Sequence, residues 1–184
     1  ILQVDIPGLE HFDRVLEQLR AVQGDFELMA WVERAEALLP VLAQQAVIMQ
    51  QKYDVVVTNP PYMGSSGMGG KLGQFVKDFY PDSKSDMSTV CMEKAMAMCK
   101  PNGYMAMINI PVWMFLSSYE KLRQKLLGHN EIVNMVHPGR GIFGSDFGTT
   151  TFVFQKMHIA GYKGSYHRLF DVQGEVKSNE EREN

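Results

Sequence analysis

Four consecutive residues, Asn59-Pro60-Pro61-Tyr62, place hydrogen-bond acceptors and an aromatic ring at one point of the chain. The two prolines fix two φ angles and lack amide donors, so the carbonyl groups lie on a stiff loop with few donors. Asn59 adds a side-chain carbonyl acceptor, and Tyr62 adds a flat aromatic face with a polar tip. Such groups suit the binding of an amino group attached to a planar ring.

An amino group on an aromatic ring is a poor nucleophile because its lone pair is delocalised into the ring. Hydrogen bonds from its two N–H groups to the Asn59 side-chain oxygen and the Pro60 carbonyl oxygen would favour a tetrahedral nitrogen, and would stabilise the positive charge that develops as a methyl group arrives. Tyr62 would hold an adenine by stacking once the base has left the duplex. We therefore predict Asn59, Pro60 and Tyr62 as catalytic residues, with a rigid turn at a strand end as the structural alternative.

The segments around the tetrapeptide alternate between strands and helices. The β-branched run 53–58, directly before it, predicts a buried parallel strand. Ligands of open α/β sheets bind outside the carboxyl ends of such strands. Helices are predicted at about 85–100, capped by Ser85, and 118–127, and strands at 104–110, 131–136 and 148–155. This order predicts the latter half of a doubly wound α/β sheet.

The two ends of the chain differ from its middle. Apolar residues recur at helical spacing before residue 52, which predicts a helical segment whose second helix is broken or kinked at Pro40. The last residues, 175–184, are a charged tail without apolar periodicity. We predict a helical segment at 1–51, half of a catalytic domain at 52–160, and a tail at 161–184. The chain is expected to be a piece of a longer polypeptide, whose remainder is its first expected partner.

Composition limits the class of protein. Of the 184 residues, 45% are hydrophobic and 21% are charged, which excludes wholesale disorder and fits one globular domain. The formal charge of −3 excludes a strongly basic nucleic-acid binder as a description of the whole chain. No apolar run approaches the ~20 residues of a membrane span. Cys91 and Cys99 fit no disulfide framework or zinc pattern, and the histidines show no metal-ligand spacing. We predict a cytoplasmic protein with no metal site and no membrane partner.

Residues from Tyr53 to about Met157 resemble the C-terminal half of the catalytic domain of adenine-specific DNA methyltransferases that use S-adenosylmethionine. The resemblance is strongest to the methyltransferases of bacterial phage-exclusion (phage growth limitation) systems and related restriction–modification enzymes. It implies the latter half of a Rossmann-like methyltransferase sheet, with parallel strands, a C-terminal antiparallel hairpin and preceding N-terminal helices. The matching segments are the strand and tetrapeptide at 54–62, the helix start at 85–87, the turn at 100–104, the stretch 111–113 and the predicted hairpin at 141–154.

The resemblance also implies roles for single residues. Phe143, in the predicted hairpin, would be the second residue to stack on the flipped base beside Tyr62, and an ordinary core aromatic fits that position equally well. Asn59 and Pro60 would also touch the edge of the S-adenosylmethionine site. Independently of the resemblance, the position of Asp86 at a helix start predicts that it caps its helix or, less favoured, orients the catalytic loop.

A glycine-rich segment, 64–71, follows the tetrapeptide. Its glycine spacing fits neither a phosphate loop nor a dinucleotide fingerprint. We predict a mobile loop that orders over the target nucleotide, in which Ser65, Ser66 and Lys71 contact DNA phosphates, with a passive surface loop as an equally favoured alternative.

The sequence departs from the family in its first part. The family's glycine-rich cofactor loop precedes the catalytic motif, and nothing between Ile1 and Gln51 supplies it. We therefore expect this chain alone to bind S-adenosylmethionine weakly or not at all and to be inactive. DNA is the expected macromolecular partner. A homodimer through the open edge of the strand 53–58, or through the N-terminal helices, is a further expectation.

Two other functions remain open from the residues. The same tetrapeptide serves protein-glutamine and ribosomal RNA methyltransferases, because an amide nitrogen presents the same chemical problem as an aryl amine. A non-catalytic interaction module that uses the fold as a scaffold is the third alternative. Phe143 would separate the first two, since a glutamine side chain needs no stacking partner.

Overall fold

The computed structural model describes residues 14, 17–18, 21, 26–141 and 148–172, and it divides into two compact units, 1–51 and 52–184. In the first unit the helix α2, Phe26–Gln50, runs through Pro40. The predicted break is therefore wrong, because a proline removes one backbone donor while the neighbouring turns keep their own hydrogen bonds. The first helix of the predicted helical segment lies almost wholly outside the described residues.

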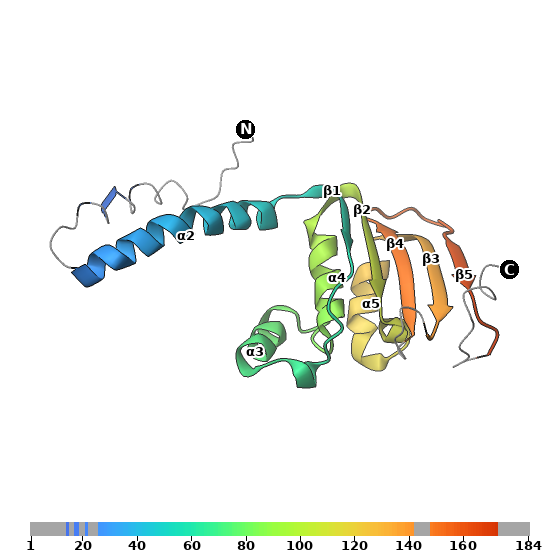
Figure 1. The fold of residues 1–184 in the computed structure, drawn as a ribbon. Helices are drawn as coiled ribbons and strands as arrows, with labels where there is room; N and C mark the ends of the chain where they lie inside the picture. Colours follow the sequence, from blue (N-terminus) through green and yellow to red (C-terminus); the bar gives the residue numbers. More distant parts are fainter. Residues whose placement is uncertain (1–13, 15–16, 19–20, 22–25, 142–147, 173–184) are drawn as a thin grey trace. The chain divides into compact units, whose positions relative to one another are not determined.

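The second unit is built on a mixed sheet with the strand order β1-β2-β4-β3-β5 (Figure 1). The strands β1 and β2 are parallel, β4 runs antiparallel between β2 and β3, and β5 is parallel to β3. The predicted parallel strands and C-terminal antiparallel pair are confirmed, whereas β5 falls where only a tail was expected. The bounds are Tyr53–Thr58 for β1, Cys99–Asn109 for β2, Glu131–Gly139 for β3, Thr149–Gln155 for β4 and Ser165–Arg168 for β5.

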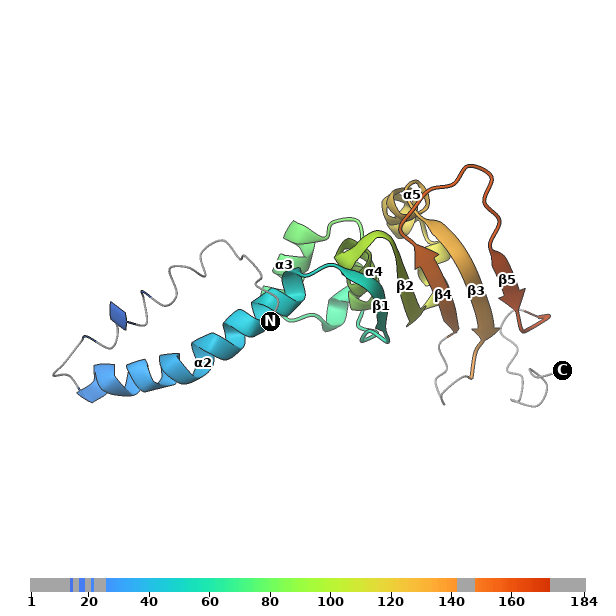
Figure 2. The ribbon, with the colours of Figure 1, turned by 90° about the horizontal axis from the view of Figure 1, so that it is seen from above.

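The helices α4 and α5 cover one face of this sheet (Figure 2). Alternate residues of β2 and β4 point into this layer, and Met105 and Phe154 are fully buried there. Trp113 packs edge-on against Phe152 with ring centroids 5.4 Å apart. The helices are α3, Gly70–Phe79; α4, Met87–Met98; and α5, Glu120–Leu127; short 3-10 turns are η1, Ser65–Gly67; η2, Pro111–Met114; and η3, Ser117–Tyr119.

The opposite face of the sheet is open where β1 lies at the edge. Val55 is 57% exposed and Val57 is 70% exposed, and only Val56 of this run packs against the core. The prediction of a buried strand is therefore wrong for β1. Among the described residues it pairs only with β2, so it has the β-branched composition of an interior strand in an edge position.

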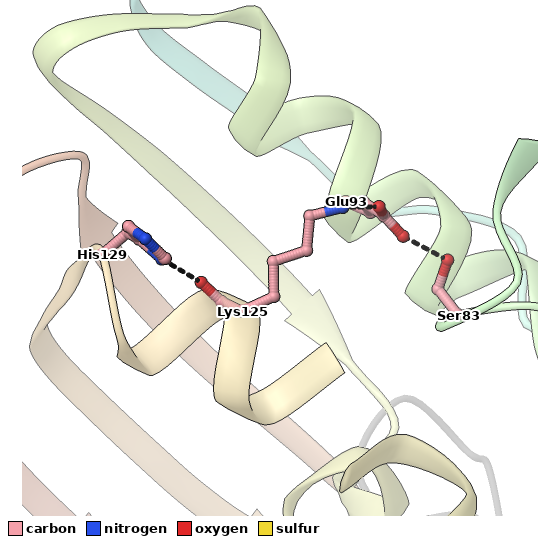
Figure 3. Close-up of polar contacts among 4 residues, drawn as sticks. All are labelled: Ser83, Glu93, Lys125 and His129. Carbon is pink, nitrogen blue, oxygen red and sulfur yellow. Dashed lines mark hydrogen bonds and ion pairs between the residues drawn. The ribbon is translucent and has the colours of Figure 1, made fainter. Parts of the chain in front are cut away.

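A chain of polar contacts ties α4 to α5 on the covered side (Figure 3). The Ser83 hydroxyl donates to Glu93 Oε2 over 2.8 Å, and Lys125 forms an ion pair with Glu93 Oε1. The ring of His129 lies 3.2 Å from the Lys125 carbonyl oxygen, not against the Glu93 carboxylate. Serine, carboxylate and imidazole therefore form no proton relay, and the cluster joins the two helices.

The end of β3 contains a histidine whose neutral form is preferred. Burial, with a smaller effect of Arg168, lowers the pKa of His137. Its Nδ1 accepts the Gly139 N–H over 3.2 Å, and its ring packs edge-on against Phe170.

We expect the stability of the fold to fall on acidification because of His137. A lowered pKa means that the unfolded state binds the proton more readily, so stability is present above the ordinary histidine pKa of about 6.5 and is lost as the pH falls through it. Urea unfolding at pH 7.5 and 5.5 should show a smaller loss for His137→Gln, which cannot titrate, than for the unchanged protein. Equal losses in the two proteins would contradict this assignment.

Candidate functional site

The tetrapeptide lies directly beyond β1, at the carboxyl end of that strand. Asn59 is exposed, Pro60 is buried, and Tyr62 is 38% exposed. Asn59 lines a hollow of about 490 Å³ on the open sheet face, whose other walls come from β1, β2, β3 and β4. The Asn59 side chain therefore lies at a hollow near the carboxyl end of a strand, where ligands of open α/β sheets bind, and Tyr62 is not among the residues that line the hollow.

Tyr62 closes over Asn59 in this structure. Its hydroxyl donates to Asn59 Oδ1 over 3.0 Å and also lies 3.2 Å from the Ile108 carbonyl oxygen of β2. Burial raises the pKa of Tyr62, which keeps the phenol protonated as a donor. The Asn59 oxygen is thus satisfied by its own neighbour, and a bound amine would have to displace the Tyr62 hydroxyl.

The loop is held in place by pairing with the start of α4. The Met87 N–H donates to the Met63 carbonyl over 2.8 Å, and the Ser65 N–H donates to the Ser85 carbonyl over 3.0 Å. Gly64 and Asp86, between them, form an antiparallel bridge. Main-chain pairing on both sides of Gly64 fixes the chain that leaves Tyr62.

Asp86 forms the N-cap of α4. Its carboxylate accepts hydrogen bonds from the Ser88 N–H over 2.8 Å and from the Ser88 hydroxyl over 2.6 Å. The capping role favoured for Asp86 is confirmed, and the assignment of Ser85 as the cap is wrong. A carboxylate is a strong cap, and its charge also suits the positive end of the helix.

Asn109, at the end of β2, is a site residue that the sequence did not reveal. It is fully buried, and its amide donates to the Ser88 carbonyl over 3.3 Å while its Oδ1 accepts the Ile110 N–H over 2.7 Å. Thr150 of β4 donates to the Asn109 carbonyl over 3.3 Å. Asn109 therefore links the helix that anchors the loop to the central strands. The feature of the sequence that could have indicated Asn109 is its position as an asparagine at the end of a predicted strand.

The other predicted contact residues fall in two groups. Ser65 and Ser66 lie in η1 and Lys71 in the first turn of α3, and all three are exposed. The predicted loop 64–71 is thus partly helical, while its contacts with DNA stay predictions. Phe143 lies outside the described residues. In the part of the chain that the structure describes, no three acidic, cysteine or histidine side chains gather as metal ligands, and no helix is long and apolar enough to cross a membrane.

Comparison with known proteins assigns the family. Residues 9–143 match the model of the Eco57I restriction-modification methylase. The chain belongs to this family. The adenine-specific methyltransferase BrxX of Escherichia coli O9:H4 (strain HS) is 43% identical to this chain over 181 residues. That match covers 96% of the chain but only 15% of BrxX, so the chain spans a small part of the relative's length.

Solved structures support the fold of this chain. A putative class I S-adenosylmethionine-dependent methyltransferase of Listeria monocytogenes has 16% identity and a TM-score of 0.50, covering 64% of this chain and 37% of its own. The DrdV–DNA complex has 16% identity and a TM-score of 0.57, covering 77% of this chain and 17% of its own. The mixed sheet with its helices is thus part of a Rossmann-like methyltransferase fold, as predicted.

The Asp86 cap can be tested by replacement. We expect Asp86→Ala to lower the free energy of unfolding by about 1 kcal/mol, because the N-terminal N–H groups of α4 lose their acceptor. Asp86→Asn keeps a cap oxygen of the same shape and should lose much less. Urea unfolding of both variants would measure the difference, and equal losses would show that the cap oxygen does not matter.

Proposed function

We propose that this chain carries the base-binding part of an adenine-specific DNA methyltransferase, acting in restriction–modification or phage defence. The observation that carries the proposal is the exposed Asn59 side chain, which lines a hollow at the carboxyl end of β1 and accepts a hydrogen bond from Tyr62. Membership of a restriction-modification methylase family and the name of the BrxX relative support it.

The proposed chemistry needs acceptors and no activated protein nucleophile. An extruded adenine would donate its two amino N–H groups to Asn59 Oδ1 and the Pro60 carbonyl oxygen. These bonds would favour a tetrahedral nitrogen, whose lone pair would then be free to accept a methyl group. The nitrogen then loses a proton to regain its conjugation. Tyr62 would stack on the base after its hydroxyl leaves Asn59.

S-adenosylmethionine is the methyl source that the fold and the resemblance support, and it supplies an electrophilic methyl group. Asn59 and Pro60 would meet only the edge of this cofactor. The hollow beside Asn59 is lined by apolar, threonine and asparagine side chains, with no acidic residue among its described walls to bind a ribose. The described residues thus do not fit a whole cofactor, and we assign them to the base side of the site.

DNA is the proposed macromolecular partner. We also propose that the open edge of β1 and its exposed Val55 and Val57 pack against further parts of the longer polypeptide, since BrxX is much longer than this chain. The homodimer through the same edge stays a prediction, and the comparisons give it no support. Methylation of RNA or of protein glutamine is the alternative function, and an assay with labelled S-adenosylmethionine distinguishes it from methylation of DNA.

The Tyr62 hydroxyl and ring should have separable effects on adenine binding. Tyr62→Ala should weaken the binding of an adenine-containing single strand about tenfold, because base–aromatic stacking contributes roughly 1–3 kcal/mol. Tyr62→Phe keeps the ring and frees Asn59, so we expect equal or tighter binding. Fluorescence anisotropy at one fixed salt concentration measures both. Adenine binding by Tyr62→Ala that equals that of the unchanged chain would contradict the stacking role.

The isolated 184-residue chain should not transfer methyl groups from labelled S-adenosylmethionine to DNA, because its described residues provide only the base side of the site. Radioactivity in DNA after incubation is the measurement, and incorporation above a protein-free control would overturn this expectation. Incorporation into ribosomal RNA or a glutamine peptide, but not DNA, would instead support the alternative substrates.

A further inference from the structure

We infer that a second pocket beside the catalytic loop binds a backbone phosphate of the DNA strand whose base enters the site. The pocket lies between η1, α3 and the segment that joins α3 to α4, and its volume is about 260 Å³. A pocket of this size has room for a phosphate group. The inference rests on the proposed function, because it supplies the strand contact that base binding at Asn59 needs.

Two lysines give the pocket its charge. Lys77 projects from α3, Lys84 comes from the segment before α4, and no acidic side chain lines the pocket with them. Within the described part of the chain, neither lysine has an ion pair or a hydrogen-bond partner. Two ammonium groups near one pocket repel each other. An anion bound between them would attract both, so the electrostatic energy of the pair would become favourable.

Several lysines elsewhere in the same unit have structural hydrogen-bond or ion-pair partners. Lys52 and Lys156 donate to the Ala97 and Cys99 carbonyls at the end of α4, over 2.6 and 2.8 Å. Lys100 forms an ion pair with Asp54 over 2.8 Å. These ammonium groups have structural acceptors. Lys77 and Lys84 share with Lys71, Lys94 and Lys121 the lack of an acceptor among the described residues, and they differ from these in lining one pocket together without an acidic side chain.

The pocket is fixed to the catalytic loop. Ser65 lines it and is only three residues beyond Tyr62, a length of chain that spans at most about 11 Å. The Ser65 N–H donates to the carbonyl of Ser85, another wall of the pocket. A small apolar cluster of Met68, Val76 and Val90 packs α3 against α4 and holds the Lys77 wall.

This arrangement positions a strand without reading its sequence. A lysine ammonium is a compact point charge that suits a phosphate but carries no base information. The pocket would therefore bind the backbone of the strand, and Tyr62 would stack on its base. The site should bind any single strand, including one that contains no adenine.

The test uses the 184-residue chain and a fluorescent oligothymidine, which offers phosphates but no adenine. Lys77→Gln and Lys84→Gln should each weaken binding about fivefold at low salt. Each should also reduce the slope of log K against log salt by about 0.7, the value for one phosphate contact on a single strand. Lys121→Gln, at an exposed position of α5, is the matched control and should change neither. Circular dichroism would verify that the variants fold.

Three results would overturn the inference: no oligothymidine binding by the unchanged chain, a double Lys77→Gln/Lys84→Gln variant with the original salt slope, or an equal effect of Lys121→Gln.

A parallel titration with an adenine-containing strand separates this inference from the proposed function. If the lysine variants lose oligothymidine but Tyr62→Ala leaves adenine binding unchanged, the phosphate site stands and the base site fails. The opposite pattern removes the phosphate site and leaves the base site intact.

Discussion

The pairing between residues 63–65 and 85–87 is the constraint on which the site depends. Two main-chain hydrogen bonds there fasten the loop that follows Tyr62 to the first turn of α4. Asp86 caps that turn, and Asn109 connects it to the end of β2. Each such bond contributes only about 1 kcal/mol net, but an unsatisfied buried partner costs roughly 1–3 kcal/mol, so the parts of this network hold one another in place.

The hydrogen bond between Tyr62 and Asn59 gives this rigid frame one adjustable element. The side chain that would stack on the base blocks the acceptor that would bind its amino group. Breaking the neutral Tyr62–Asn59 hydrogen bond costs about 1 kcal/mol net. A new hydrogen bond from an incoming amine to the same Asn59 oxygen offsets that loss. Because the Tyr62 hydroxyl and a bound amine can replace each other, Asn59 Oδ1 has a hydrogen-bond partner both with and without a ligand.

Much of the sheet and the place of the tetrapeptide could be predicted from the sequence. The β-branched run before Asn59 and the alternation of segments located β1 and its carboxyl end, because local composition determines them. The exposure of Val55 and Val57 could not be predicted, since burial depends on which neighbours a strand has. The helix α3 was missed because three glycines at its start indicate a loop, whereas the contact of Val76 with Val90 stabilises it. Asn109 gains its role only from contacts with residues distant in sequence.

The central claim is that Asn59 Oδ1 and the Pro60 carbonyl oxygen receive the amino group of an extruded adenine. A crystal structure of this chain with an adenine-containing strand tests it most directly. The account predicts that the adenine amino nitrogen lies within hydrogen-bond distance of both oxygens, with the Tyr62 hydroxyl displaced from Asn59. An adenine bound elsewhere, with the Tyr62–Asn59 hydrogen bond intact, would contradict it.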